Sequence, residues 1–288
     1  MPLPRLALAV IGDEIAPSLD EMISFAAENR VRRLDMRTVG GRNILGMTPE
    51  EVRAIRHALD RAGIEVPTFV SPVLKWPAPG KAAPGGKTVD FAFDPAQCPA
   101  SDAIAYAFDV ADALGASRLR IFSHLRYPGY RPQDLGPALE RLLALAARRG
   151  VSLEMENEPV CNVGSVGELA AFFEAMPPSE PARLRPLVDI ANGWSMGAPP
   201  GDGEIAALAP WVDQIHLKDR DVAGGRTVPL GDGDVPWANE LRRLLKDVEV
   251  PEVLASIETH CPHDGRNATT RSVAAIRRIA REIGAEIV

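Results

Sequence analysis

The chain has 288 residues, of which 46% are hydrophobic and 25% charged, so it carries enough apolar material for a sizeable core. Its formal net charge of -7 comes without a dense Lys/Arg tract, which argues against a nucleic-acid binder, because such proteins need a basic surface to contact phosphates. Charges interrupt every apolar stretch before about 18 residues, the length at which a membrane span is considered.

The cysteines Cys98, Cys161 and Cys261 lie far apart and form no C-x-x-C pair, so the sequence suggests neither a zinc knuckle nor a redox motif. Reduced thiols predict a cytoplasmic location. The first apolar run leads into Gly12 and Asp13 rather than into a small-residue cleavage site, so we interpret it as a strand and not as a signal peptide. Assembly into a homo-oligomer stays open.

Short apolar runs alternate with longer stretches of helical period along the whole chain, which predicts βα units and a parallel sheet. The predicted strands are residues 6–11, 33–38, 65–71, 118–123, 152–157, 185–190, 214–218 and 253–259. Eight such units predict an α/β fold with a single (β/α)8 TIM barrel over residues 1–288. An open doubly wound sheet is the alternative, but no G-x-G-x-x-G follows any predicted strand.

Helix boundaries have their own signals. Three predicted helix starts carry Ser or Thr followed three residues later by Glu, the capping-box pattern: Ser18/Glu21, Thr48/Glu51 and Ser165/Glu168. Helix ends are predicted at Gly63, Gly115 and Gly150, because glycine adopts the left-handed C-cap without strain. These signals divide the chain where the strand pattern does.

One long irregular stretch, residues 75–100, follows the third predicted strand and contains PAPGKAAPGGK. Loops of this length in compact domains are usually functional or disordered. Because it leaves the carboxyl end of a strand, where TIM barrels keep their active sites, we predict a lid over the mouth. A surface insertion without function is the alternative.

Acidic residues and histidines interrupt the later apolar strands near their carboxyl ends. The fifth predicted strand carries Glu154 and Glu156, the sixth ends at Asp189, the seventh contains His216 and the eighth ends at Glu258. Side chains of this kind at one barrel end would repel one another unless a cation lay between them. Oxygen-rich ligands with one imidazole favour Mn²⁺ or Mg²⁺, while Co²⁺ and Zn²⁺ remain open.

The fifth predicted strand does not identify its own ligand. A period of two places Glu154, Glu156 and Glu158 on one side of the strand, and all three cannot bind one metal ion. Spacing alone leaves the choice between them open. A salt bridge to a neighbouring arginine is the alternative for each of them.

Other polar and aromatic residues at strand ends are candidates for substrate binding. Lys218, Arg37, Lys75 and Arg126 could hold an anionic group of a substrate, although Lys218 could equally pair with Asp219 or Glu258. His124 and His260 could bind a substrate hydroxyl or a second metal. Three tryptophans could form an apolar wall for a sugar ring or serve in packing, namely Trp76, Trp194 and Trp237.

Four segments, LEMENE, LVDIAN, IHLKD and IETH, together resemble the ligand-bearing strands of the sugar phosphate isomerase/epimerase family of xylose isomerase-like barrels. Further similar segments are LDMRTVGGRNI, FVSPVLKWP and LRIFSH. The resemblance covers nearly the whole chain. It includes ketose 3-epimerases, hydroxypyruvate isomerase and inosose dehydratase, so it implies an enzyme acting on a small sugar or sugar phosphate.

The resemblance implies Glu154, Asp189, His216 and Glu258 as metal ligands, with Glu158 in contact with substrate. It also implies that Glu154 and Glu258 pass a substrate proton between them, from strands that we expect to face one another across the barrel. Ketose epimerases carry a histidine where this chain has Asn192, so the resemblance does not extend to a tagatose- or psicose-type substrate.

The sequence therefore predicts a divalent-metal-dependent isomerase or epimerase of a small sugar, sugar phosphate or related hydroxy-carbonyl compound. A dehydratase of a cyclic polyol or keto-inositol is the alternative among enzymes, because it also begins with proton abstraction beside a metal-polarised carbonyl. A non-catalytic sugar-binding barrel is the alternative outside enzymes. An endonuclease of the same fold would need more histidines than five and a basic face.

Overall fold

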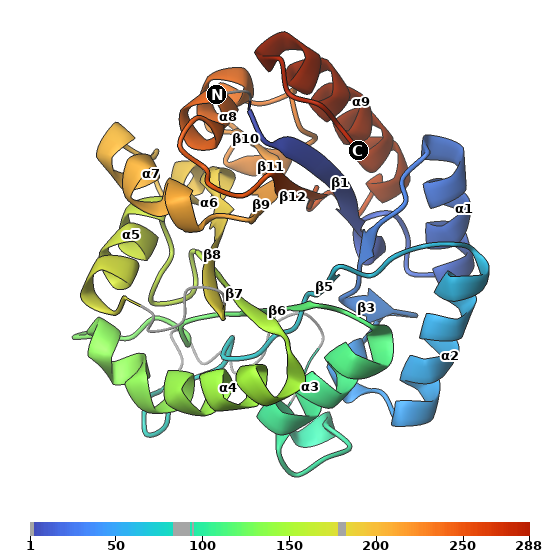
Figure 1. Cartoon of the computed structure of the whole chain (residues 1–288), viewed down its shortest axis with the longest axis vertical. Coiled ribbons are helices and arrows are strands. Elements are labelled where there is room, and N and C mark those ends of the chain that lie inside the picture. Colours follow the sequence, from blue (N-terminus) through green and yellow to red (C-terminus); the bar gives the residue numbers. More distant parts are fainter. Residues whose placement is uncertain (1–2, 83–92, 94, 178–182) are drawn as a thin grey trace.

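The computed structural model of the chain describes residues 3–82, 93, 95–177 and 183–288. Seen down its short axis, a ring of strands lies at the centre and helices surround it (Figure 1). The predicted TIM barrel is confirmed, and all eight predicted strands contribute to it.

The central sheet has eight parallel strands in the order β2-β1-β12-β9-β8-β7-β6-β5. Their bounds are β1 Arg5–Ile11, β2 Leu34–Asp35, β5 Thr68–Phe69, β6 Arg118–Ile121, β7 Ser152–Glu156, β8 Leu184–Asp189, β9 Gln214–Leu217 and β12 Glu252–Ile257. Isolated parallel bridges join Arg33 to Glu65 and Met36 to Phe69, and so link β2 with β5 around the ring. Because pairing at this junction is broken into bridges, β2 and β5 are shorter than predicted.

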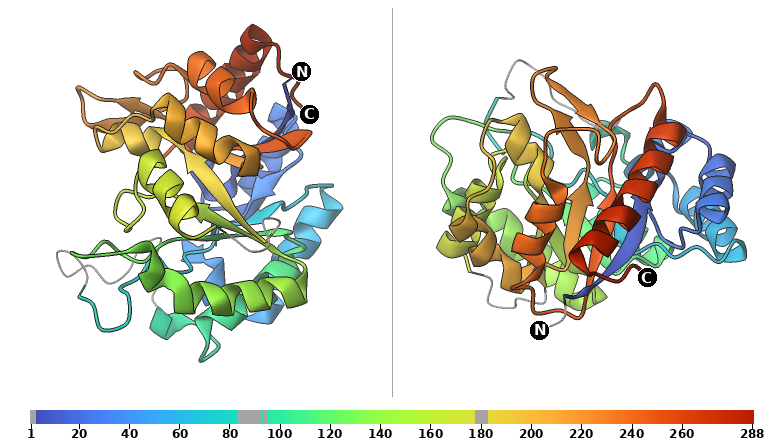
Figure 2. Two further views of the ribbon diagram at one scale, coloured as in Figure 1. Left: turned by 60° about the vertical axis from the view of Figure 1, so that its left-hand side comes forward. Right: turned by 90° about the horizontal axis from the view of Figure 1, so that it is seen from above.

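Helices connect successive strands on the outside of the ring. They are α1 Leu19–Asn29, α2 Pro49–Arg61, α3 Ala103–Leu114, α4 Gly136–Arg149, α5 Val166–Ala175, α6 Ile190–Ser195, α7 Asp202–Leu208, α8 Trp237–Leu245 and α9 Gly265–Ile283. After α9 the chain returns to β1, where Leu6 N donates to Glu286 O, so the two termini lie near each other (Figure 2). None of the helices in these described ranges combines the length and apolar character that a membrane span requires.

The helix boundaries follow the predicted signals. Reciprocal capping boxes form at Thr48 and Ser165, and Ser18 accepts a hydrogen bond from the backbone of Glu21. Gly115 and Gly150 are left-handed C-caps with φ of 68° and 69°. Caps of this kind satisfy backbone groups that the helix itself leaves unpaired.

Alternation along the strands divides the core into two zones. Leu6, Leu8 and Val10 of β1 belong to the large apolar cluster between strands and helices, whereas Ala7 and Ala9 face the barrel interior. Leu254 of β12 joins these two alanines, but many inward positions of the other strands are polar and buried. The small inward side chains of β1 leave room for these longer polar groups.

Two short hairpins extend the chain beyond the strand ends. β3 Thr38–Val39 pairs with β4 Arg42–Asn43 after β2, and β10 Asp219–Asp221 pairs with β11 Arg226–Val228 after β9. Both follow the carboxyl ends of barrel strands, so they border the face where TIM barrels hold their active sites.

Candidate active site

Four buried side chains from four neighbouring strands meet at the carboxyl end of the barrel. Glu156 ends β7, Asp189 ends β8, His216 lies in β9 and Glu258 directly follows β12. These strands are consecutive in the sheet, so each delivers one group to the same place. One oxygen or nitrogen atom of each residue lies within 4.8 Å of those of the other three.

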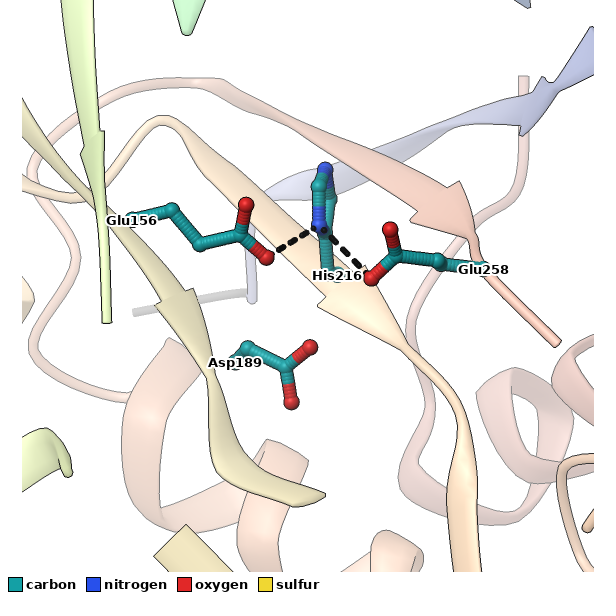
Figure 3. A group of neighbouring side chains, drawn as sticks. All are labelled: Glu156, Asp189, His216 and Glu258. Carbon is teal, nitrogen blue, oxygen red and sulfur yellow. Dashed lines mark hydrogen bonds and ion pairs between the residues drawn. The ribbon is translucent and has the colours of Figure 1, made fainter. Parts of the chain in front are cut away.

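The imidazole of His216 stands between the two glutamates, as Figure 3 shows. Its Nδ1 atom is 2.9 Å from an oxygen of Glu156 and 3.4 Å from an oxygen of Glu258. Among the described residues, His216 Nε2 has no hydrogen-bond partner although it is buried. The carboxylates are thus arranged around Nδ1 as a common centre.

Two buried arginines approach the glutamates from outside this centre. Arg120 Nη1 donates to Glu156 Oε2 at 2.9 Å, and Arg37 Nη1 donates to Glu258 Oε1 at 3.0 Å. Arg120 is fully buried in β6. The guanidinium groups therefore contact the oxygens that point away from His216.

Lys218, two residues after His216, places a third positive charge at the cluster. Its Nζ atom is 2.5 Å from Asp189 Oδ2 and 2.8 Å from Glu258 Oε2. Burial raises the pKa of the Asp189 carboxyl; Lys218 opposes this, while Glu258 and Glu156 add to it. Asp189 therefore ionises less readily than an exposed aspartate, even beside an ammonium group.

The glutamates and the histidine strengthen each other's charge. Burial opposes ionisation of Glu156, but His216 and Arg120 outweigh it and lower its pKa to about 2. Burial also opposes protonation of His216, but Glu156 and Glu258 outweigh it and raise the pKa of the imidazole to about 10. The field at this point strongly attracts positive charge.

Among the described residues, the connected ion-pair network contains more carboxylates than cations. Its cations are Arg37, Arg120 and Lys218, and its carboxylates are Asp13, Glu14, Glu156, Asp189 and Glu258. Three positive charges against five negative ones leave an excess of two negative charges when the histidines are neutral. A divalent cation would balance this excess, and unbalanced buried charge is costly.

The donor set fits a metal ion. Three carboxylates and one imidazole are ligands that Mn²⁺, Mg²⁺, Co²⁺ and Zn²⁺ accept, and oxygen-rich sets favour the first two. The unpartnered, buried Nε2 of His216 is compatible with a ring that is oriented by a ligand at Nδ1. This buried cluster could therefore hold a metal.

The sequence profile of the xylose isomerase-like TIM barrel family matches residues 15–280. The chain belongs to this family. No curated protein matches the sequence significantly. The resemblance seen in the strand motifs is thus confirmed at the level of the family.

Solved structures share this fold at low sequence identity. D-allulose 3-epimerase from Methylomonas sp. has 17% identity and a TM-score of 0.68, covering 97% of this chain and 100% of that one. A probable 3-DHS dehydratase, AsbF from Bacillus anthracis, has 16% identity and a TM-score of 0.66, covering 95% and 98%. The IOLI protein, described with a bound zinc atom, has 13% identity and a TM-score of 0.71, covering 96% and 99%.

Glu154, expected as a ligand, lies outside the four-residue cluster. It precedes Glu156 by two positions, so both point into the barrel, but Glu154 lies one layer nearer the amino ends of the strands. There it accepts a hydrogen bond from Ser152 at 2.6 Å and lies 3.9 Å from Arg118. The expectation for Glu154 is therefore corrected to Glu156, its neighbour on the same face.

The expectation that the fifth and eighth strands face one another also needs correction. In the sheet order β8 and β9 separate β7 from β12, and the strand opposite β12 is β6. Glu156 and Glu258 nevertheless lie on either side of His216, and each has an oxygen within 3.4 Å of its Nδ1 atom. The strand opposite β12 contributes Arg120 instead.

The other predicted cationic substrate-binding residues lie around the mouth, and each forms an ion pair with a carboxylate. Lys75 Nζ is 3.3 Å from Glu158 Oε2, and both side chains are largely buried. Arg37 and Lys218 are held by the carboxylates described above. Arg126 forms a two-pronged ion pair with Glu168 at the start of α5.

His124 and Trp76 lie together after β6 and β5. His124 adopts a left-handed backbone with φ of 59°, and its Nδ1 is 3.2 Å from the carbonyl oxygen of Trp76. Burial lowers the pKa of His124. A neutral imidazole of this kind can serve as a hydrogen-bond partner for a hydroxyl group.

The remaining candidates divide between site and packing. His260 Nε2 is 3.2 Å from Glu258 Oε1, so this histidine joins the mouth. Trp237 is buried at the start of α8 and packs in the apolar core, and Trp194 is partly buried against that core. Both positions agree with the alternative interpretation that these two tryptophans serve in packing.

Two buried residues of the site were not predicted from the sequence. Arg120 interrupts the apolar strand RLRIF, and a charge in a fully buried strand is a signal that could have identified it. Glu14 follows β1 and accepts hydrogen bonds from Arg37 and from the backbone of His260. The signal that could have identified Glu14 is the acidic pair, Asp13 and Glu14, after the first strand.

The predicted lid over residues 75–100 is described only near its ends. Residues 83–92 and 94 lie outside the described residues. Phe93 is buried, with its ring centroid 6.3 Å from that of Trp76. The lid stays a prediction from the sequence.

Proposed function

We propose that this chain is a divalent-metal-dependent isomerase or epimerase of a small, uncharged hydroxy-carbonyl compound such as a ketose. The observation that carries the proposal is the convergence of Glu156, Asp189, His216 and Glu258 within 4.8 Å in a buried site. Membership in the xylose isomerase-like family and similarity to an allulose epimerase support an enzyme of this class.

Glu156 and Glu258 are the proposed proton-transfer pair. They flank His216 from two sides, so a substrate held above the imidazole would lie between two carboxylates (Figure 3). Positive neighbours lower the pKa of both groups despite burial, so both are ionised and able to accept a proton. One would remove the proton beside the carbonyl and later release it to water, and the other, after taking up a proton from water, would deliver it on the opposite face.

A divalent ion held by these side chains would supply Lewis-acid polarisation of the substrate carbonyl. Asp189 and His216 complete the set of side chains that would hold it. Lys218 and the Lys75/Glu158 pair offer donors and an acceptor for substrate hydroxyls at the mouth. Burial of the whole cluster keeps water from competing for these contacts.

The positively charged side chains at the mouth already form ion pairs with carboxylates, which favours an uncharged substrate. The sequence left sugar phosphates open because Arg37, Lys75 and Lys218 could bind an anion. Each of them already contacts a carboxylate, at 2.6 Å, 3.3 Å and 2.5 Å respectively. A phosphate would have to separate buried ion pairs, which costs several kcal/mol. We expect a free ketose to be preferred over its phosphate ester, as measured by kcat/KM for a matched pair.

A deuterium-exchange experiment tests the proposal. Metal-replete protein in D2O should incorporate deuterium beside the carbonyl of at least one compound in a panel of ketoses. Glu258→Gln should lower exchange by about 100- to 10,000-fold with metal content held constant. Full exchange in a metal-replete Glu258→Gln protein would overturn the assigned role, and loss of water from the substrate would assign the chain to the dehydratases instead.

A further inference from the structure

The two glutamates of the cluster each present their oxygens to two different environments. Glu156 Oε1 faces His216 Nδ1 at 2.9 Å, whereas Glu156 Oε2 accepts from Arg120. Glu258 Oε2 faces His216 and Lys218, whereas Glu258 Oε1 accepts from Arg37. Inner oxygens therefore converge on the centre, and outer oxygens are held by guanidinium groups.

The guanidinium of Arg120 is itself fixed by the barrel. Its Nε donates to the carbonyl of Ser71 at 3.3 Å and its Nη2 to that of Val70 at 3.4 Å. The guanidinium carbon lies 4.6 Å from the ring centroid of Phe122. The side chain is fully buried, so these contacts are not exposed to solvent.

Arg120 also lies between the two glutamates. The same Nη1 atom that donates to Glu156 is 3.8 Å from Glu258 Oε1. It comes from β6, the strand opposite β12, and so reaches the cluster from the far side of the barrel. Its guanidinium thus lies near the carboxylates of two side chains that belong to different strands.

We propose that Arg120 is a positioning residue of the metal centre, which holds the outer oxygen of Glu156 so that only the inner oxygen faces the ion. Arg37 does the same for Glu258. This inference rests on the proposed metal-dependent function. One oxygen from each glutamate leaves coordination positions open for a substrate, whereas two-oxygen binding would fill them.

Positioning and charge neutralisation predict opposite effects of removing Arg120. Removing a positive charge beside the site should strengthen the attraction for a divalent cation if charge were all that mattered. Loss of an outer hydrogen-bond partner instead weakens metal binding by about 10- to 100-fold, because the ligand loses its orientation. The sign of the change separates the two explanations.

Calorimetric titration of the metal-stripped full chain with Mn²⁺ tests the proposal. Arg120→Met should bind Mn²⁺ about 10- to 100-fold more weakly than the unaltered protein. Arg118→Met is the matched control, since Arg118 lies on the same strand two residues away and contacts Asp213 at 3.3 Å rather than a cluster carboxylate. The control should leave the affinity unchanged.

Unchanged or tighter binding by a folded Arg120→Met protein would overturn the positioning role alone. If Arg120→Met does not fold, Arg120→Lys decides, because it keeps the charge but cannot hold Glu156 and two carbonyls together. Wild-type affinity in that variant would also overturn the proposal. Absence of Mn²⁺ binding by the unaltered protein would instead overturn the metal-dependent function, and the positioning role with it.

Discussion

The barrel interior contains two polar layers that share strands β7, β9 and β12, on which their residues lie two positions apart. The upper layer is the cluster Glu156, Asp189, His216 and Glu258. The lower layer, nearer the amino ends of the strands, consists of Asp35, Thr68, Glu154, Gln214 and Ser256. All nine residues are buried, yet the two layers satisfy their polar groups in different ways.

The lower layer largely satisfies itself by hydrogen bonds. Thr68 Oγ1 donates to Gln214 Oε1 at 3.1 Å, and Gln214 Nε2 donates to Ser256 Oγ at 3.3 Å. Asp35 closes the ring by accepting from Ser256 Oγ at 2.5 Å and from the backbone N–H of Thr68 at 3.0 Å. The upper layer is held by ion pairs and keeps an excess of negative charge.

The pKa values of Asp35, Glu154 and Glu156 reflect this difference, although burial also raises the pKa of Asp189 in the upper layer. Burial raises the pKa of Asp35, and its hydrogen bonds do not compensate. Burial together with the charge of Asp213 raises the pKa of Glu154 to about 8, although Arg118 opposes it. Glu156 has its pKa lowered to about 2, because His216 and Arg120 outweigh burial. The same residue type is thus favoured as an acid in the lower layer and as an ion in the upper one.

The largest expected effect is a difference in turnover between variants of the two glutamates of β7. Glu156→Gln should lower turnover by about 100-fold or more, because it removes a proposed base and ligand. Glu154→Gln, the matched control, should retain metal binding and most of the turnover. Steady-state kinetics with metal content measured in each variant checks this. The reverse ranking would return the ligand role to Glu154 and contradict the division into layers.

Metal removal should destabilise the protein through the upper layer. At a free Mn²⁺ concentration 100 times its Kd, binding stabilises the folded state by about 2.7 kcal/mol. Thermal melting with chelator and with added Mn²⁺ measures the difference. Asp189→Asn should lose most of the Mn²⁺-induced shift, whereas Ser256→Ala should keep it. An equal shift in both variants would place the ion elsewhere.

A substitution confined to the lower layer should affect stability and not metal binding. Thr68→Val keeps the shape but leaves Gln214 Oε1 without its donor, which costs about 1–3 kcal/mol. Urea unfolding measures the loss. Thr270→Val, at an exposed position of α9, should change stability by less than about 0.5 kcal/mol. A large drop in Mn²⁺ affinity of Thr68→Val would show that the layers are coupled.

The smallest expected effect concerns an ion pair outside both layers. Glu168 is partly exposed, and although burial raises its pKa, hydrogen bonds from Arg126 and the backbone of Gly164 outweigh this and lower it below 4.5. Its contribution is therefore present above pH 4.5 and is lost as the pH falls through the lowered value. Glu168→Gln should cost about 0.5–1 kcal/mol at pH 7 and less at pH 3. A cost independent of pH, in unfolding measured at both values, would contradict this.

Much of the fold could be predicted because its signals are local. A strand of period two, a Ser or Thr with Glu three residues later, and a glycine at a helix end all act through neighbouring residues, as Thr48, Ser165 and Gly115 show. The polar ends of the later strands were likewise visible, because parallel strands of a barrel end at one face. Asp189, His216 and Glu258 were predicted in this way, and the structure brings them together.

The tertiary structure alone decided which groups meet. Glu154 and Glu156 share one face of β7, so period two cannot separate them, and the choice depends on the stagger between strands. The pairing of Lys75 with Glu158 and of Arg37 with Glu258 joins residues 83 and 221 positions apart, which no local pattern encodes. The sequence by itself therefore determined the barrel and the strands that carry the site, while packing determined the layer each side chain occupies and the charge beside it.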